Sequence, residues 1–319
     1  MQKRLSFIVP VYNVRDYVIR CLTALVNQNI PATDYEIIVV NDGSSDDSLA
    51  LVTEFAQSYS NIQIINQENQ GVSVARNRGF EWAGSQYIWF IDSDDWITQN
   101  CLKDLLAVLE ENQLDMLCVG PSVAAQADFD HYFSKEKSLS SRISGKEALL
   151  RGNYFIAPWC YIFRKELLSE NKIQFMPHVR YEDEEYIPRV LYYAKNVMNL
   201  TNFSVYFYYI WEGMISKSTA TKLIFDKLVV AKSIQNFAAH SISEKELKEV
   251  FRYKSHSLIL SGFNDIALNK SKHLLNQYIQ TAKQLKLYPF KIEITSIKRS
   301  VLFILWNIVP GVMCQLKKR

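Results

Sequence analysis

The first 120 residues alternate between short apolar runs and segments whose apolar residues recur every three or four positions. Short runs rich in Val and Ile predict strands, and the longer spacing predicts amphipathic helices. Because the strand-like runs are apolar on both faces and alternate with helices, they predict a mostly parallel sheet covered on both sides. The expected strands are 5–11, 35–42, 62–66, 87–92 and 115–120, and the expected helices are 15–28, 44–59, 71–83 and 99–112.

The pattern is less regular beyond residue 120. Residues 121–145 are polar and irregular, and the pattern is helical from residue 216 onward. We therefore expect an α/β domain over residues 1–213, in two halves (1–120 and 121–213), followed by a helical extension over 214–319. Between these regions we expect helices at 144–152, 164–171 and 182–194, and strands at 157–163 and 203–211.

The last residues, "SVLFILWNIVPGVMCQLKKR", contain an apolar run of about 16 residues interrupted by Asn307 and Pro310. A membrane-spanning helix needs roughly 20 apolar residues, so this run is too short to span a bilayer. With Lys298, Arg299 and residues 317–319 beside it, the run fits an interfacial helix on a membrane surface. A helix packed on the body of the protein is the equal alternative.

The charge is unevenly distributed along the chain, although the net charge is only +3. Residues 1–100 contain six Lys and Arg against twelve Asp and Glu, whereas residues 241–319 contain fourteen against five. The acidic N-terminal part is unsuited to nucleic acid, and the basic C-terminal part suits an anionic membrane. We expect no nucleic-acid partner and a peripheral membrane contact through the C-terminus.

The five cysteines of the 319-residue chain are scattered and form no CxxC pair. This spacing is typical of reduced thiols and indicates neither a disulfide framework nor a zinc site. The N-terminus shows no cleavage-site pattern, so we expect no signal peptide. Together these features predict a cytoplasmic protein, peripheral at the inner face of the cell membrane.

Three carboxylates end the predicted strand in "YIWFIDSDDWIT": Asp92, Asp94 and Asp95. An unpaired buried carboxylate is costly, so each needs a partner or water. Mg²⁺ and Mn²⁺ prefer oxygen ligands, often one or two carboxylates completed by substrate phosphates. We favour a cation site over a helix cap, because capping needs one acid and Thr98 is better placed for it.

Two further side chains are candidates at the same edge of the predicted sheet. Asp42 in "VVNDGSSD" is either a turn residue before an N-capping Ser44 or Ser45, or an acceptor for the imide N–H of a uracil beside Tyr12. Arg76 in "ARNRG" is either solvated or a neutraliser of the nearby acids. The chain has no GxGxxG or GxxxxGK[ST] motif, so a phosphate group needs another means of binding.

The acid cluster "YEDEEY" at 181–186 is the remaining candidate. The helix macrodipole accounts for Glu184 and Glu185 in a first turn. Glu182 and Asp183 precede a full turn, which makes them candidates for a general base at an acceptor hydroxyl. His178 is a spare candidate for a base or a metal ligand.

Five segments occur in one order: "FIVPVYN", "EIIVVNDGSSDDS", "NQGVSVARNRG", "YIWFIDSDDWI" and "YEDEEY". In these segments the sequence resembles the family 2 glycosyltransferases, inverting enzymes with the nucleotide-diphospho-sugar-binding GT-A fold. The resemblance is dense over residues 5–112 and implies a nucleotide-binding half followed by an acceptor half. It implies a UDP-sugar donor, Mn²⁺ or Mg²⁺, and a saccharide or lipid-linked saccharide acceptor of the bacterial surface-polysaccharide type.

The resemblance also implies a role for each matching residue. Pro10 and Tyr12 would line the nucleotide, Asp42 would bind the base, and Arg76 would contact the nucleotide. Asp92 would lie near the ribose or sugar, and Asp94 would bind the metal. Asp183 would be the catalytic base, with Glu182 beside it. The chain departs from the family pattern at Trp159, which has no lysine after it, and at Trp211 and Glu212, where relatives often carry Arg. These departures concern the acceptor.

Two other functions were weighed against the glycosyltransferase. A nucleotidyltransferase would carry a Gly-rich loop with a basic residue after the first strand, and "VPVYN" has neither. A non-catalytic nucleotide-sugar-binding module would have lost the acids of the strand end or of the Glu-Asp pair, and all are present. We therefore expect an enzyme of the hexosyltransferase type.

Overall fold

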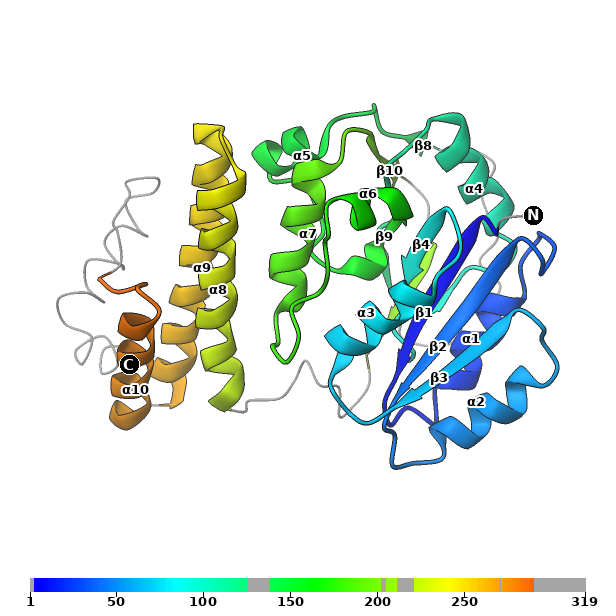
Figure 1. Cartoon of the computed structure of the whole chain (residues 1–319), viewed down its shortest axis with the longest axis horizontal. Helices are drawn as coiled ribbons and strands as arrows, with labels where there is room; N and C mark the ends of the chain where they lie inside the picture. The colour runs from blue at the N-terminus through cyan, green and yellow to red at the C-terminus, as the bar shows by residue number, and fades with distance from the viewer. Residues whose placement is uncertain (1–2, 125–137, 202–204, 211–220, 270, 290–319) are drawn as a thin grey trace. The chain divides into compact units, whose positions relative to one another are not determined.

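The computed structural model describes residues 3–124, 138–201, 205–210, 221–269 and 271–289 (Figure 1). The chain forms two compact units. The first contains Met1–His178 and Tyr186–Ile215, and the second contains Val179–Glu185 and Ser216–Arg319. The C-terminal apolar run and the residues Trp211 and Glu212 lie outside the described residues.

Within the described residues of the first unit, eight strands form one sheet in the order β3-β2-β1-β4-β9-β6-β10-β8. The first four of these strands are parallel, and β9 runs antiparallel to both of its neighbours. The mostly parallel sheet predicted from the sequence is therefore confirmed. Its strands are β1 (Leu5–Val11), β2 (Tyr35–Asp42), β3 (Ile62–Gln67), β4 (Tyr87–Phe90), β6 (Met116–Cys118), β8 (Ser138–Leu139), β9 (Tyr161–Arg164) and β10 (Val197–Thr201).

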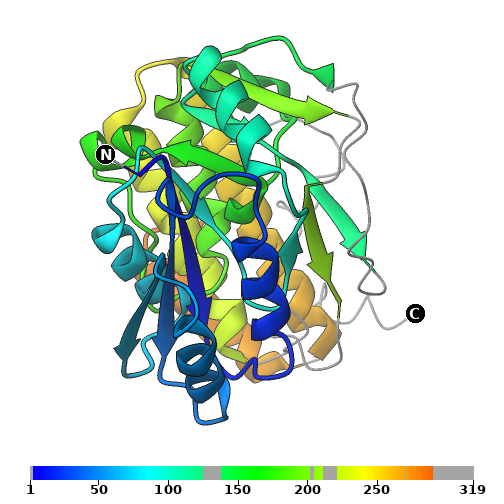
Figure 2. The ribbon, with the colours of Figure 1, turned by 90° about the vertical axis from the view of Figure 1, so that its right-hand side faces the viewer.

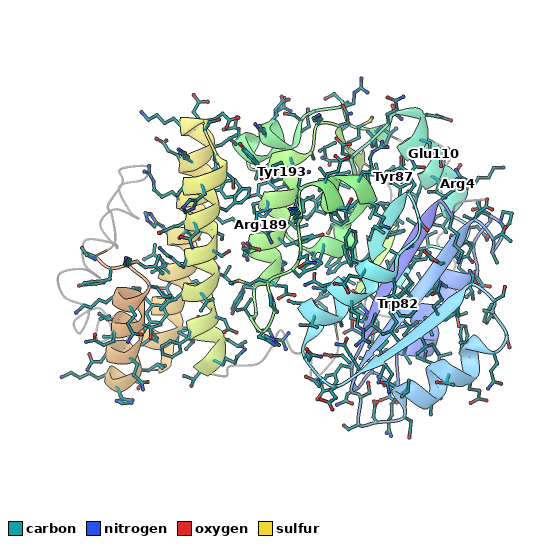
Figure 3. The ribbon with its side chains drawn as sticks, in the orientation of Figure 1. Arg4, Trp82, Tyr87, Glu110, Arg189 and Tyr193 are labelled. Atoms are coloured by element: carbon teal, nitrogen blue, oxygen red, sulfur yellow. The ribbon has the colours of Figure 1, made fainter. Side chains whose placement is uncertain are left out.

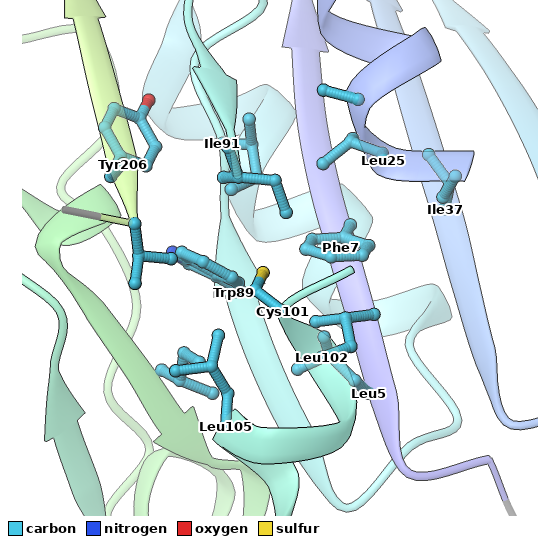
Figure 4. Packing of buried hydrophobic residues seen from close by; sticks show 14 of the residues in the cluster. Leu5, Phe7, Leu25, Ile37, Trp89, Ile91, Cys101, Leu102, Leu105 and Tyr206 are labelled. Carbon is cyan, nitrogen blue, oxygen red and sulfur yellow. The ribbon is translucent and has the colours of Figure 1, made fainter. Parts of the chain in front are cut away.

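Helices cover the sheet on both faces (Figures 1 and 2). One face buries Phe7 and Trp89 against apolar side chains of α1 and α4, such as Leu25 and Leu102 (Figure 4). Full burial of each large apolar side chain contributes about 1.5–3 kcal/mol, so this cluster fixes the strands firmly. The helices are α1 (Val18–Val26), α2 (Ser48–Ala56), α3 (Val72–Trp82), α4 (Leu102–Glu111), α5 (Gly145–Arg151), α6 (Lys165–Glu170) and α7 (Glu182–Tyr193).

Helix α3 lies on the opposite face and approaches β1 and β2 closely at Gly79. A Cβ atom at this position would lie 2.4 Å from Ile8 Cγ2 and 3.3 Å from Val40 Cγ2. Glycine therefore permits a helix-to-sheet distance that any other residue would increase. The close approach fixes where the N-terminus of α3 and its Arg76 lie relative to the ends of these strands.

A second, three-stranded sheet joins segments that are far apart in the sequence. It contains β5 (Trp96–Ile97), β7 (Pro121–Ala124) and β11 (Tyr206–Tyr209), with β11 in the middle. The prediction of an irregular segment at 121–145 was wrong for β7, which pairs with β11 in parallel. Strand β10 was not predicted from the sequence. Both strands depend on partners distant in the sequence, which a local pattern does not show.

Several predicted helix starts also differ from the observed ones. Helix α2 begins at Ser48, so neither Ser44 nor Ser45 is its N-cap. Thr98 is not the cap of α4, which follows Cys101 without a side-chain cap. The side chain of Gln28 accepts hydrogen bonds from the first amides of α4 instead, at 3.0 and 3.2 Å. A distant side chain thus satisfies amides for which a local capping residue was expected.

The second unit is helical over its described part. Its helices are α8 (Thr221–Ser241), α9 (Lys245–Asn269) and α10 (Lys272–Gln284), and α8 packs along α9 (Figure 1). Gly262 of α9 lies directly under the Tyr278 hydroxyl of α10, which donates a hydrogen bond to the Ile259 carbonyl at 3.1 Å. In the described part of the chain, no helix combines the length and apolarity needed to cross a bilayer.

Charged side chains close the amino edge of the main sheet. Arg4 forms a paired contact with Glu110 at 2.8 and 2.7 Å, and Figure 3 shows both beside Tyr87, at the start of β4. At the start of β2, the buried Glu36 carboxylate accepts five hydrogen bonds, including one from Ser6 at 2.6 Å. Such a carboxylate is stabilising only while these partners surround it. The other four donors are Lys3, Gln63, Gly84 and Ser85.

Burial alone raises the pKa of the Glu36 carboxyl, but the hydrogen bonds outweigh it, and the pKa lies below its ordinary value of 4.5. Because the folded state lowers this pKa, the Glu36 charge stabilises the fold fully above about pH 4.5, the ordinary value, and this contribution is lost as the pH falls through the lower folded value. We predict that Glu36→Gln lowers the free energy of unfolding at pH 7 by about 2–4 kcal/mol. Urea denaturation from pH 7 downward would show this deficit shrinking in acid.

The exposed Glu54→Gln is the control for the Glu36 prediction and should change stability by less than about 0.5 kcal/mol. A deficit that stays constant across the acid range would contradict the assigned role of the Glu36 charge.

Candidate active site

The carboxyl ends of β1, β2 and β4 lie side by side. The strand register pairs Val11 with Asn41 and Ile8 with Phe90, so the residues after each strand emerge at one edge. Pro10 is buried in β1 opposite Val40, and Tyr12 follows it with 42% of its surface exposed. An exposed aromatic ring at the carboxyl edge of a parallel sheet is well placed to contact a ligand.

Asp42 ends β2 and is 2% exposed. Its Oδ1 accepts hydrogen bonds from Gln67 Nε2 at 2.7 Å and the Gln70 amide at 2.8 Å, and its Oδ2 accepts one from the Gly71 amide at 2.8 Å. Gly71 is the N-cap of α3, with a positive φ of 89°. The carboxylate thus lies at a helix N-terminus, where the macrodipole favours negative charge. Gln67 ends β3, and Gln70 and Gly71 belong to the loop before α3. The sequence had indicated a turn at Gly43 after Asp42 but none of these three partners.

Asp92 follows β4 and pairs with Arg76 of α3. Arg76 Nη2 donates to Asp92 Oδ1 at 2.7 Å, and the two side chains are 5% and 28% exposed. The guanidinium also lies 5.2 Å from the Phe175 ring centroid. A buried arginine of this kind needs a carboxylate partner, so the pair holds the start of the acidic loop (residues 92–95) against α3.

Asp94 is partly exposed, and its main chain is fixed by Arg20 of α1. Arg20 Nη2 donates to the Asp94 carbonyl oxygen at 2.7 Å. The guanidinium carbon lies 4.1 Å from the Trp96 ring centroid and 4.3 Å from that of Tyr209. These contacts hold the cation between two aromatic faces. Arg20 was not identified from the sequence, because its aromatic partners come from β5 and β11, far away along the chain.

Asp95 has a structural role that distinguishes it from the other two acids. It is fully buried and accepts hydrogen bonds from the Tyr206 hydroxyl at 2.7 Å and the Tyr209 amide at 2.8 Å. Burial, together with the nearby charges of Asp92 and Asp94, raises the pKa of the Asp95 carboxyl to about 9. Asp95 therefore anchors the loop to β11 and is not available to an incoming ligand.

An aromatic stack lies beside this loop and was also missed from the sequence. The Trp159 ring stacks on Tyr206, with centroids 4.4 Å apart, and on Tyr208, with centroids 5.6 Å apart. Trp159 and Tyr208 are half-buried. Partly exposed aromatic faces suit the apolar faces of a ligand, so the stack is a candidate ligand-binding surface that does not depend on the absent lysine.

Glu182 and Asp183 open helix α7 in the second unit. Asp183 is half-buried and its Oδ1 accepts a hydrogen bond from the Glu184 amide at 2.8 Å. Glu184 forms an ion pair with Lys254 at 2.5 Å, and Glu185 accepts a hydrogen bond from Ser233 at 2.9 Å. The last two acids thus have side-chain partners in addition to the helix macrodipole.

Six of the predicted site residues are brought together at the carboxyl edge of the sheet in the first unit. They are Pro10, Tyr12, Asp42, Arg76, Asp92 and Asp94. Glu182 belongs to the second unit and is 9% exposed. His178 belongs to the first unit and is exposed, with a positive φ of 62°. The roles assigned to all of these residues remain predictions.

A divalent cation fits the carboxylates of the acidic loop in one particular way. Across the described ranges, no group of three or more His, Cys, Asp and Glu side chains forms a ready metal site. Asp94 offers carboxylate oxygens on a main chain fixed by Arg20. One or two carboxylates with substrate phosphates are the usual ligands of Mg²⁺, so this loop suits a cation that arrives with a diphosphate.

The family model of glycosyl transferase family 2 matches residues 6–171, more than half of the chain. The uncharacterized glycosyltransferase YibD of Escherichia coli K12 is 28% identical over 67% of this chain and 63% of its own length. The poly(ribitol-phosphate) beta-N-acetylglucosaminyltransferase TarS of Staphylococcus aureus is 28% identical over 64% of this chain and 35% of its own length. The chain therefore spans less than two thirds of these relatives.

Two solved structures show the same fold. The crystal structure of residues 1–349 of S. aureus TarS with UDP-GlcNAc matches with a TM-score of 0.67 and 21% identity, over 89% of this chain and 81% of that TarS fragment. The mannosyltransferase PcManGT from Pyrobaculum calidifontis with GDP-Man and Mn²⁺ matches with a TM-score of 0.57 and 14% identity, over 99% and 87%. The predicted GT-A fold is confirmed, and the matched model shows that the chain belongs to glycosyl transferase family 2.

Proposed function

We propose that the chain transfers a sugar from a nucleotide-diphosphate donor, a UDP-sugar, to a hydroxyl of a saccharide or lipid-linked saccharide, with inversion at the anomeric carbon. One observation carries the proposal. The partly exposed Asp92 and Asp94 lie at the same edge of the sheet as Asp42 and the exposed Tyr12 ring. The nucleotide sugars bound to TarS and PcManGT support a donor of this class.

The donor would lie across the carboxyl ends of β1, β2 and β4. The Tyr12 ring would pack against the base, and the remaining acceptor capacity of Asp42 Oδ2 would take a base N–H. Arg76 offsets the charge of Asp92, which reduces repulsion between this edge and a diphosphate. Mn²⁺ or Mg²⁺ held by Asp94 and the diphosphate would offset the charge on the leaving nucleoside diphosphate.

Asp183 would act as general base in this reaction. The acceptor hydroxyl loses its proton to the Asp183 carboxylate while its oxygen bonds to the anomeric carbon. The bond from that carbon to the diphosphate breaks, and the leaving nucleoside diphosphate takes the electron pair. Because attack comes from the face opposite the leaving group, the configuration inverts. Glu182, beside Asp183 in the first turn of α7, would add a second carboxylate at the acceptor hydroxyl.

The acceptor would meet the aromatic stack of Trp159, Tyr206 and Tyr208. A saccharide presents apolar C–H faces that suit such rings. The poly(ribitol-phosphate) named for TarS supports an acceptor that is a hydroxyl-bearing polymer. We further propose that the enzyme works in the cytoplasm, at the inner face of the membrane, on a lipid-linked chain. The fourteen basic residues between positions 241 and 319 support contact with an anionic surface.

We predict that Asp94→Ala weakens cation-dependent binding of UDP at least about tenfold, because it removes a carboxylate ligand. Titration calorimetry with UDP in Mn²⁺ and in EDTA measures the effect. Asp47→Ala is the matched control, since Asp47 is 75% exposed and pairs with Arg15 only at 3.6 Å. Equal affinity of Asp94→Ala and the parent protein in Mn²⁺ would remove the metal role.

A second prediction concerns Arg20. Replacement by Met keeps the aliphatic stem but removes the cation between Trp96 and Tyr209 and the bond to the Asp94 carbonyl. We expect Arg20→Met to lower the free energy of unfolding by about 1.5–3 kcal/mol and to weaken Mn²⁺-dependent UDP binding. Arg15→Met, at a 56% exposed arginine, should change stability by less than about 0.5 kcal/mol. Indistinguishable urea midpoints for the two variants would refute the prediction.

The third prediction tests the base. Asp183→Asn keeps the shape of the side chain and its bond from the Glu184 amide, but it cannot take a proton at neutral pH. We expect kcat for transfer to fall about 10²–10⁴-fold with UDP affinity near that of the parent. Steady-state transfer assays and calorimetry on one preparation separate the two quantities. Parent-level turnover by the variant would eliminate Asp183 as the base.

A further inference from the structure

The backbone directly before the candidate base is strained. Tyr181 has a φ of +64° and immediately precedes Glu182 and Asp183, which open α7. A bulky aromatic residue rarely adopts this left-handed conformation, which glycine or asparagine tolerates better. Such a residue persists only where surrounding contacts hold it, and strain of this kind clusters at functional sites.

Two consecutive residues of α8 supply contacts that hold this turn. Asp226 Oδ2 accepts a hydrogen bond from the Arg180 amide at 3.0 Å. The ammonium of Lys227 lies 5.0 Å from the centroid of the Tyr181 ring. Asp226 therefore fixes the peptide group between Val179 and Arg180, and Lys227 contacts the side chain of Tyr181.

Both of these charged residues are buried. Asp226 is 6% exposed and is also bonded by Lys222 at 3.3 Å. Lys227 is 4% exposed, and its ammonium donates to Ser261 at 2.7 Å and pairs with Asp265 at 2.5 Å, both on α9. Each buried charge pairs with a more exposed partner, since the Lys222 side chain is 67% exposed and the Asp265 side chain 37%. Burying a charge costs free energy that such a pair recovers only in part. Their presence is better explained by a geometry that must be specified.

The first turn of α7 is held on its other side by the same helices. Glu184 pairs with Lys254 of α9, and Glu185 accepts a hydrogen bond from Ser233 of α8. Asp183 therefore lies between a fixed turn before it and two fixed acids after it. The segment that carries the candidate base is held by α8 and α9 within the second unit.

We propose that Asp226 and Lys227 are positioning residues, which hold the strained Arg180–Tyr181 turn so that the Asp183 carboxylate keeps the orientation needed for proton transfer. The inference rests on the proposed function for its catalytic meaning. It gives the helical extension an indirect role in the reaction, since α8 fixes the turn before the base. Neither residue touches the reacting atoms in this account.

Asp226→Ala and Lys227→Met test the proposal by two measurements on the full chain. Amide hydrogen exchange followed by mass spectrometry reports on residues 179–185, and steady-state transfer assays report kcat and the KM for the donor. Displacement of a catalytic group by about 1 Å can cost about 10²-fold, so we expect kcat to fall about 10–100-fold with donor KM changed less than about threefold. Exchange in residues 179–185 should accelerate at least about tenfold in Asp226→Ala.

Two further variants keep the result decisive. Asp226→Asn retains an oxygen that accepts from the Arg180 amide, so it should keep most of the exchange protection and turnover lost in Asp226→Ala, and it replaces the alanine variant if that fails to fold. Lys232→Met is the control on the same helix, since the Lys232 side chain makes no hydrogen bond or ion pair within the described residues, and it should change neither quantity.

The outcomes separate the inference from the function on which it rests. Unchanged exchange in Asp226→Ala and Lys227→Met, or faster exchange with parent-level kcat, would overturn the positioning role. A parallel rise in donor KM equal to the loss in kcat would also overturn it, because a general loss of structure would then explain both. Absence of turnover in the parent protein on any nucleotide sugar would instead overturn the proposed function.

Discussion

The packing of α3 on β1 and β2 is the interaction on which the candidate donor site depends. Gly79 allows α3 to lie against Ile8 and Val40. The distance between helix and sheet at this point determines where the side chains and the N-terminus of α3 lie relative to the strand ends. Its N-terminal amide at Gly71 reaches Asp42, and its Arg76 reaches Asp92. One helix thus provides partners for acids at the ends of two strands. A larger residue at position 79 would move both contacts together.

The carboxylates at the carboxyl edge of the sheet have different partners. Asp42, Asp92 and Asp95 are each tied to protein groups, through a helix N-terminus, an arginine and a tyrosine-lined strand. At Asp94 it is the main chain that Arg20 fixes. The cost of gathering negative charge is met by local partners, and the charge that remains partly exposed is suited to a cation that comes with a substrate diphosphate. In the second unit, the buried Asp226 and Lys227 likewise contact neighbouring groups and hold the turn before Asp183.

Much of this arrangement was predictable from the sequence, and the features that were not predicted share a physical cause. Apolar strands such as 35–42 alternating with helices predicted the parallel sheet, because that pattern is local. Strand β11 falls within the predicted strand 203–211, but β5, β7 and β10 were missed, because their stability comes from pairing with distant segments. Arg20 was not identified from the sequence for the same reason, since its aromatic partners lie on β5 and β11. Asp226 reads as an ordinary helix residue until the fold brings it to the Arg180 amide.

Thermal unfolding of the full chain with UDP-, GDP-, CMP- and dTDP-sugars, each with Mn²⁺ and with EDTA, shows whether the acidic edge binds a donor through a cation. We expect the UDP class of donor to raise the Tm when Mn²⁺ is present and EDTA to remove the shift, because the carboxylates hold the diphosphate through the cation. A panel in which no donor raises the Tm with Mn²⁺, or in which the rise is the same in EDTA, would contradict this expectation.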